Sequence, residues 1–300
     1  MNKVYKILSV VLLAFLFYGC NTSKRESIIA DNAKLEKLSG QFSFTEGPTA
    51  DKVGNVYFTD QPNNKIYKYD TAGNLSVFID SAGRSNGLYF DANDMLWACA
   101  DGQNQLWKIN PKNKAVEVIL NEEAKPLYNG PNDVWVHKKG FVYFTDPLYQ
   151  RPYWDAPHDT LTIKGLYFLT EADTKPIVAD SSFQQPNGLV GDSRNQLLYV
   201  SDIDAGKTYR YNITPLGLLR DKELFVAQGS DGMTLDSKGN LYLTGKGVDV
   251  YNSSGKHIQH IDVPEDWTAN VCFGGPNNDE LFITASKSLY RLQMNAKGVE

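Results

Sequence analysis

The sequence predicts an all-β protein: a six-bladed β-propeller with four-stranded blades. Three observations support this prediction. A strand recurs six times at spacings of 40 to 56 residues, a turn comes directly before each copy, and a polar residue lies 11 or 12 positions before the central aromatic of each copy. Repeats of about 40 to 50 residues that contain several short strands are typical of propellers, in which each repeat forms one blade.

The recurring strand has a shared ending. Its copies are NVYFTD (55–60), MLWACAD (95–101), FVYFTDP (141–147), LLYVSD (197–202), NLYLTG (240–245) and ELFITAS (280–286). Their central aromatic residues are Tyr57, Trp97, Tyr143, Tyr199, Tyr242 and Phe282. Turns such as DKVGN and DSKGN precede the copies, so each copy is expected to form a hairpin with an earlier strand. We call the earlier, innermost strand A and the recurring strand B.

Polar residues at the start of the A strands are expected to form a ring. These ring residues are Glu46, Asn86, Asn132, Asn187, Asp231 and Asn270. The innermost strands of a propeller line its central channel, so residues at equivalent positions surround the axis. Strand B runs back to the face from which strand A starts. That return brings Asp146, at the end of a B strand, to the same face.

The ring has the composition of a site for a divalent cation. The carboxylates of Glu46 and Asp231 balance two positive charges, and the amide oxygens of Asn132 and Asn187 add neutral hard ligands. Ca²⁺ prefers such a set, with Mg²⁺ or Zn²⁺ as alternatives, although the His and Cys ligands that favour zinc are absent from the ring. In the competing interpretation, these residues satisfy backbone groups at strand starts in a wet channel.

A long connection follows the third B strand, at residues 147–165. It is rich in aromatic and basic residues, and long ordered loops of this kind are commonly binding loops. The candidates for a substrate wall are Tyr149, Arg151, Tyr153, Trp154 and His158. Alternatively, the loop packs on itself with its aromatic residues as a plug.

Composition and the N-terminus indicate an exported protein with a small-molecule partner. A net charge of −5 without basic runs argues against a nucleic-acid partner. Residues 1–20 have the pattern of a signal peptide, and Cys20 after Gly19 resembles a lipoprotein signal in which Cys20 carries the lipid. The alternative is a cleaved signal peptide with an incidental cysteine. We expect a tether at 21–33, a propeller at 34–300, a periplasmic or cell-envelope location, and membrane contact through Cys20 alone.

Two further expectations concern the propeller itself. Residues 35–44 could supply the outer strand of the last blade, beside residues 288–294, and such pairing between the two ends of the chain closes the ring. Cys99 and Cys272 fall at interior strand positions in distant parts of the chain, so they are expected to be buried free thiols.

The motifs of the chain together resemble a known family. FTEGPTAD, SNGLYFD, NGPNDVWVHKKGFVYFTDPLY, QQPNGLVGD, SDGMTLDSKGNLYL and NVCFGGPNNDELFITASKSLYRL occur in the order found in the SMP-30/gluconolactonase/LRE-like family, especially its bacterial gluconolactonase-like branch. The resemblance implies a six-bladed propeller, a divalent metal that is often calcium, and hydrolysis of lactones. It also implies Glu46, Asn132, Asn187 and Asp231 as metal ligands. Gly130 departs from the animal members, which carry an Arg there for the sugar acid.

Three functional hypotheses follow. In the first, the protein is a metal-dependent lactonase in which Asp231 is the general base or solely a ligand, while Asn86 and Asn132 hydrogen-bond substrate oxygens. Asp101 and Asp146, at the ends of B strands, are expected to bind sugar hydroxyls or, alternatively, to cap the turns that follow these strands. In the second, the same site cleaves aryl esters or organophosphate-type bonds. In the third, the protein is a non-enzymatic propeller that binds glycans or proteins and holds calcium for structure.

Overall fold

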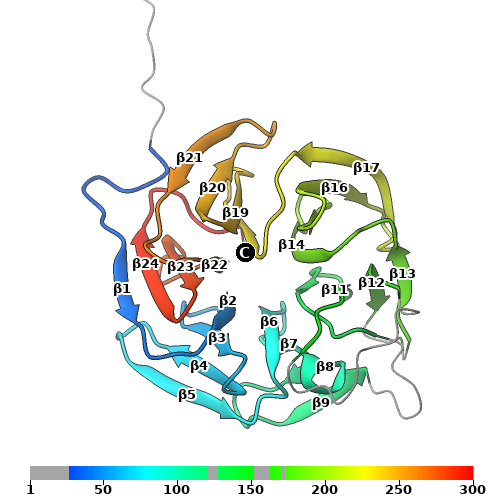
Figure 1. Cartoon of the computed structure of the whole chain (residues 1–300), viewed down its shortest axis with the longest axis horizontal. Helices are drawn as coiled ribbons and strands as arrows, with labels where there is room; N and C mark the ends of the chain where they lie inside the picture. The colour runs from blue at the N-terminus through cyan, green and yellow to red at the C-terminus, as the bar shows by residue number, and fades with distance from the viewer. Residues whose placement is uncertain (1–26, 121–127, 152–162, 171–172, 174, 300) are drawn as a thin grey trace, which may run out of the picture.

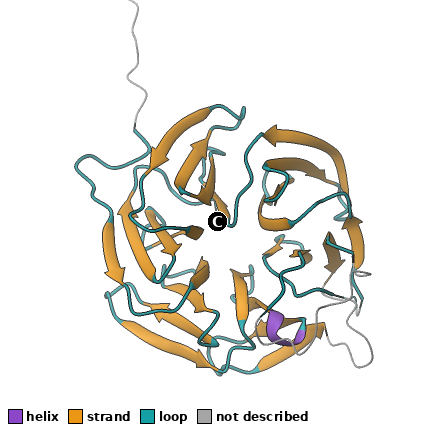
Figure 2. Ribbon diagram, in the orientation of Figure 1, coloured by secondary structure: helices purple, strands orange, loops and turns teal. Residues whose placement is uncertain are grey.

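The computed structural model describes residues 27–120, 128–151, 163–170, 173 and 175–299. In this part of the chain, six antiparallel four-stranded sheets surround a central axis (Figure 1). Apart from one short helix, the regular secondary structure of this part is strand, and loops and turns connect the strands (Figure 2). The predicted six-bladed β-propeller is therefore confirmed.

The strands follow one another from the axis outward in each blade. Blade 1 consists of β2 (Thr45–Ala50), β3 (Val56–Asp60), β4 (Lys65–Tyr69) and β5 (Leu75–Asp80). Blade 2 consists of β6 (Ser85–Phe90), β7 (Leu96–Ala100), β8 (Gln105–Ile109) and β9 (Val116–Leu120), with the short helix η1 (Asp101–Gln103) after β7. Blade 3 consists of β10 (Val134–Val136), β11 (Phe141–Asp146), β12 (Gly165–Thr170) and β13 (Ile177–Asp180).

The second half of the ring repeats this arrangement. Blade 4 consists of β14 (Pro186–Asp192), β15 (Leu197–Asp202), β16 (Lys207–Ile213) and β17 (Leu219–Val226). Blade 5 consists of β18 (Met233–Leu235), β19 (Leu241–Gly245), β20 (Gly247–Tyr251) and β21 (His257–Ile261). Blade 6 consists of β22 (Thr268–Gly274), β23 (Glu280–Ala285), β24 (Ser288–Gln293) and β1 (Glu36–Ser39).

Blade 6 joins the two ends of the chain. Its outer strand, β1, lies beside β24 (Figure 1) and pairs antiparallel with it. In this pairing Glu36 is opposite Arg291. The guanidinium of Arg291 also lies 2.7 Å from the carboxylate of Glu36. The predicted closure by residues 35–44 is confirmed, because the early strand satisfies an edge that β24 would otherwise expose.

The residues just before β1 also pack on blade 6. Ile29 forms a bridge with Met294, and the backbone N–H of Asn295 donates to the carbonyl of Ile28 (2.9 Å). Ile28 and Ile29 cover apolar residues of blades 5 and 6. Residues 27–33 of the expected tether are thus attached to the propeller. The expected signal peptide and Cys20 lie outside the described residues.

The core lies between neighbouring blades. All six central aromatics of the B strands are buried, and Trp97, Tyr143 and Tyr242 are completely so. Cys99 and Cys272 are buried free thiols, as predicted. This packing fixes the inner strands and so positions whatever they present to the channel.

Among the described residues, no helix is both long enough and apolar enough to cross a membrane.

Candidate metal and substrate site

The ring residues gather at one end of the channel. Glu46, Asn86, Asn132, Asn187 and Asn270 are buried, and Asp231 is partly buried. Contacts pass from blade to blade around the axis. Asn270 donates a hydrogen bond to Glu46, Asn187 donates one to Asp231, and the charges of Glu46 and Asp231 interact. The structure therefore brings together, around one centre, residues that are up to 224 positions apart (270 − 46) in the sequence.

The ring residues lie where regular strand pairing is interrupted. In β2 the register shifts between Glu46 and Thr49, and in β14 it shifts between Pro186 and Leu189, on either side of Asn187. In blades 3 and 5 the inner strand begins only two residues after the ring position. An interrupted ladder lets a side chain leave the alternation of the strand. This is how side chains at the strand starts reach the channel axis.

Glycine follows four of the ring residues because the next blade leaves no space for a side chain. A Cβ atom on Gly47 would lie 2.2 Å from the carbonyl oxygen of Asn86, and Gly47 has a φ of 45°. A Cβ atom on Gly232 would lie 1.9 Å from Cγ of Asn270. The recurring acid-Gly and Asn-Gly pairs are thus a packing requirement of a tight ring.

Blade 3 has an acid at the position of these glycines. Asp133 is buried and accepts hydrogen bonds from the backbone N–H groups of Val134 (3.0 Å) and Leu189 (3.3 Å). Gly87 of the preceding blade packs against it, since a Cβ there would lie 2.4 Å from Asp133 Oδ1. Burial raises the pKa of Asp133 to about 7. It is therefore a third acid beside the ring, which the sequence analysis did not single out.

The hydroxyl residues near the ends of the B strands tie successive blades together at the ring. Thr59 donates to the carbonyl oxygen of Asn86 in the next blade (3.1 Å). Thr145 donates in the same way to Asn187 (2.7 Å). These hydrogen bonds hold the backbone of the ring residues from behind.

Asp146, which follows Thr145, anchors the segment that leads into the ring. Asp146 is fully buried and accepts hydrogen bonds from the backbone N–H groups of Asn129 and Gly130, both at 2.9 Å. The equivalent acids make the same kind of contact: Asp60 with Ser43 and Phe44, and Asp202 with Gln184 and Gln185. The sequence analysis expected Asp146 to contact the substrate, whereas the contacts in the structure are with backbone N–H groups. Its carboxylate is engaged by backbone donors that would otherwise be buried without partners.

Burial disfavours the charged forms of the two ring acids, and repulsion adds to this effect at Glu46. Burial raises the pKa of Glu46 well above its usual range, and the charge of Asp231 raises it further. Burial also raises the pKa of Asp231 to about 6, against the hydrogen bonds from Trp267 and Asn187 and the charge of Arg151. Two acids of like charge, one buried and one partly buried, are stabilised in their charged forms by a cation between them.

Two ring amides remain available to a ligand. In the described part of the chain, no protein hydrogen bond reaches the side-chain amide of Asn86 or Asn132, although both residues are buried. Within the same residues, no three His, Cys, Asp or Glu side chains are grouped to hold a metal. A cation here would therefore depend on two carboxylates supplemented by amide oxygens, and such a hard-oxygen set suits Ca²⁺ or Mg²⁺ better than Zn²⁺.

Aromatic and basic residues border the ring. The hydroxyl of Tyr149 accepts a hydrogen bond from the Asn187 amide (2.9 Å), and Trp267 Nε1 donates to the Asp231 carboxylate (2.6 Å). Arg151 lies over the ring of Tyr149. Tyr149 and Arg151 therefore lie beside the ring, as the sequence analysis expected. Trp267 was not among its candidates. The candidates Tyr153, Trp154 and His158 lie outside the described residues.

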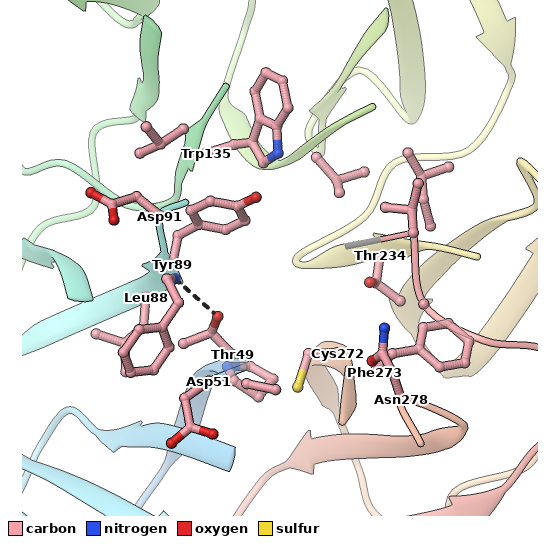
Figure 3. A pocket seen from close by; sticks show the side chains of 18 of the residues that line it. Thr49, Asp51, Leu88, Tyr89, Asp91, Trp135, Thr234, Cys272, Phe273 and Asn278 are labelled. Atoms are coloured by element: carbon pink, nitrogen blue, oxygen red, sulfur yellow. Dashed lines mark hydrogen bonds between the residues drawn. The ribbon is translucent and has the colours of Figure 1, made fainter. Parts of the chain in front are cut away.

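A cavity of about 610 Å³ extends from the ring residue Asn270 toward the turns between A and B strands. Figure 3 shows its wall, which includes Leu88 and Tyr89 from β6, Trp135 from β10 and Cys272 from β22. The backbone N–H of Phe90 donates to Thr49 at this wall (3.3 Å; dashed in Figure 3). The wall combines these side chains with charged residues of the turns between A and B strands, such as Asp51 and Asp91.

Comparisons with known proteins agree with this architecture. Residues 44–287 match the family model described as the SMP-30/Gluconolactonase/LRE-like region. The chain is 27% identical over 306 aligned positions to a gluconolactonase from Zymomonas mobilis, an alignment that covers 91% of this chain and 85% of the relative. A solved gluconolactonase structure from Xanthomonas campestris has a TM-score of 0.81 at 26% identity, covering 89% of this chain and 91% of the other. The calcium-binding regucalcin from Agrobacterium tumefaciens shares the fold, with a TM-score of 0.74 at 19% identity over 89% of this chain and 95% of the other.

Proposed function

The chain belongs to the SMP-30/gluconolactonase/LRE-like family, and on this premise we propose that it is a hydrolase that opens lactone rings, with sugar-acid lactones as substrates and a divalent cation at the ring. One observation carries the proposal. The charges of Glu46 and Asp231 interact at the end of the channel, in the same ring as the amides of Asn86 and Asn132, which have no hydrogen bond from the described residues. The similar gluconolactonases support the reaction class.

The ring residues fit a hard cation. Glu46, Asn132, Asn187 and Asp231 would hold it, and Ca²⁺ suits their oxygen atoms best. When bound, the cation supplies Lewis acidity toward the ester carbonyl. The charge of Asp231 contributes to the raised pKa of Glu46, and a bound cation would offset that repulsion.

Asp231 is the group proposed to move the proton. Its carboxylate accepts a proton from the attacking water, whose oxygen bonds to the carbonyl carbon of the lactone. The bond from that carbon to the ring oxygen then breaks, and Asp231 returns the proton to the departing oxygen. The product is a hydroxy acid, with the carboxylate and the hydroxyl on one open chain.

The other side chains position the substrate. The amide N–H groups of Asn86 and Asn132 donate to its oxygen atoms, including the carbonyl oxygen on which negative charge develops. Tyr149 is held by Asn187 and forms one side of the site. A rigid arrangement of this kind lowers the cost of orienting water and substrate.

The test is turnover of glucono-1,5-lactone by the purified propeller, with and without EDTA. We expect hydrolysis that EDTA abolishes and Ca²⁺ restores. Asp231→Asn should lower kcat by at least about 100-fold. Lactone turnover that neither EDTA nor Asp231→Asn changes would refute the proposal. Turnover of aryl esters in place of lactones would assign the site to a different scissile bond.

A further inference from the structure

Arg151 is a guanidinium fixed beside the ring. Its Nη2 lies 2.6 Å from the carboxylate of Asp101, which is fully buried, and its own side chain is only 17% exposed. Asp101 begins η1 of blade 2, whereas Arg151 follows β11 of blade 3, so the ion pair crosses between blades. Gln61 of blade 1 donates to the same carboxylate (2.8 Å). An ion pair braced in this way differs from a mobile surface pair.

A second contact holds the guanidinium toward the site. Its central carbon lies 5.3 Å from the centroid of the Tyr149 ring, within the range of a cation–π contact. The hydroxyl of Tyr149 in turn accepts the hydrogen bond from the ring residue Asn187. The charge of Arg151 also reaches Asp231. The guanidinium of Arg151 is thus linked to the ring residues through the side chain of Tyr149. Its positive charge acts on the carboxylate of Asp231.

The acids around the ring and the charge of the product indicate a role for the Arg151 guanidinium. Glu46 and Asp231 are acids of the ring and Asp133 is an acid beside it, while the product of lactone opening is itself a carboxylate. A guanidinium carries five N–H donors, and the contact with Asp101 occupies Nη2. The remaining donors match the planar, bidentate geometry with which arginine binds carboxylates.

We propose that Arg151 is a specificity-determining residue, which binds the oxygen substituents of a hydroxylated lactone and the carboxylate of the ring-opened product. This assignment rests on the proposed function. Asp101 and Tyr149 are positioning residues, because they hold the guanidinium and act on the substrate through it. The site therefore favours lactones that carry hydroxyl groups over unsubstituted ones.

The experiment compares two substrates and one product with Arg151→Gln and Arg151→Lys in the calcium-loaded protein. For Arg151→Gln we expect the ratio of kcat/KM for glucono-1,5-lactone to that for δ-valerolactone to fall at least about tenfold, mainly through KM. Gluconate should lose affinity by a similar factor in calorimetry. Arg151→Lys keeps the charge without the planar fork, so intermediate values are expected.

Arg210→Gln is the matched control. Arg210 also pairs with an acid, Glu223 (2.6 Å), and lies over an aromatic ring, Phe225 (5.3 Å), but between the outer strands of blade 4. Its loss should change stability without changing the substrate ratio. A ratio and a gluconate affinity that are equal in wild type and Arg151→Gln would overturn the assignment, as would equal losses on both lactones.

The outcome remains informative if the proposed function fails. Wild-type protein that hydrolyses neither lactone would refute the function, but gluconate binding is measured without turnover. Gluconate affinity that depends on Arg151 would then still support the binding role. Absence of gluconate binding to wild-type protein would overturn it.

Discussion

The indole N–H of Trp267 donates a 2.6 Å hydrogen bond to the carboxylate of Asp231. Trp267 directly precedes β22 of blade 6, and Asp231 lies at the start of blade 5, so the bond crosses between blades. It favours the ionised carboxylate and opposes the effect of burial on the pKa of Asp231. Trp267, a residue of the next blade, thus lowers the pKa of Asp231, the proposed general base.

Trp267→Phe tests this tuning. Without the N–H donor, the pKa of Asp231 should rise, and the acidic limb of the kcat/KM profile should move to higher pH by about half a unit to one unit. The measurement is a pH profile of lactone hydrolysis at saturating Ca²⁺. An unchanged acidic limb with full activity would show that Asp231 does not control the rate.

Calcium should stabilise the folded protein through the ring. Binding to the native state alone raises stability with ligand concentration, so Tm should increase by several degrees at a Ca²⁺ concentration about 100 times Kd. Glu46→Gln removes one of the two carboxylates and should lower the affinity at least about tenfold. Thermal unfolding over a Ca²⁺ titration measures both. Equal shifts in the two proteins would place the cation elsewhere.

Without metal, stability should fall as pH rises through the raised pKa values. Asp231 has a folded-state pKa of about 6 and Asp133 one of about 7, both above their ordinary value of 3.8. The folded state therefore holds more protons than the unfolded state, and the stabilisation, complete below about pH 4, is lost by about pH 7.

The measurement is Tm in EDTA between about pH 5 and pH 7, where acids with lowered pKa values, such as Asp180 at about 2, remain ionised in both states. We expect a fall of several degrees, and a smaller fall in Asp231→Asn, which has no carboxyl to titrate. Ca²⁺ should flatten the profile because it favours the ionised acids. A rise of Tm over this interval in EDTA would contradict the expected direction.

Gly232→Ala should disrupt the arrangement of the ring residues around the channel axis. The new Cβ would lie 1.9 Å from Cγ of Asn270, so the amide must move away from Glu46, at a cost of about 1–3 kcal/mol. Lower Tm and weaker Ca²⁺ binding are expected together. Gly40→Ala is the control, because its Cβ would meet mainly the flexible end of Lys37. Comparable losses in both variants would indicate a general effect of replacing glycine.

Asp146→Asn separates anchoring from substrate binding. The neutral amide is a weaker acceptor for the N–H groups of Asn129 and Gly130, so Tm should fall by several degrees. Asp202→Asn, in the same position of blade 4, should have a similar effect on Tm. A selective rise in KM at unchanged Tm would return Asp146 to the substrate site.

Repetition made the architecture and the ring predictable. The spacing of Tyr57 and its five counterparts gave the number of blades, and the polar residues before them gave the inner ring. The early strand that closes blade 6 was also predicted, because an unpaired edge beside residues 288–294 needs a partner. These features depend on patterns that recur along the chain, and a single sequence displays them.

The contacts that set the chemistry could not be read in this way. Trp267 on Asp231 and Arg151 on Asp101 each join different blades, at sequence separations that follow no repeat. The role of Asp146 likewise depended on which N–H groups the folded loop presents. The sequence determined which polar groups face the axis through the period of its strands; tertiary packing alone decided which of them are already hydrogen-bonded and which remain for a ligand, because that depends on distances between blades.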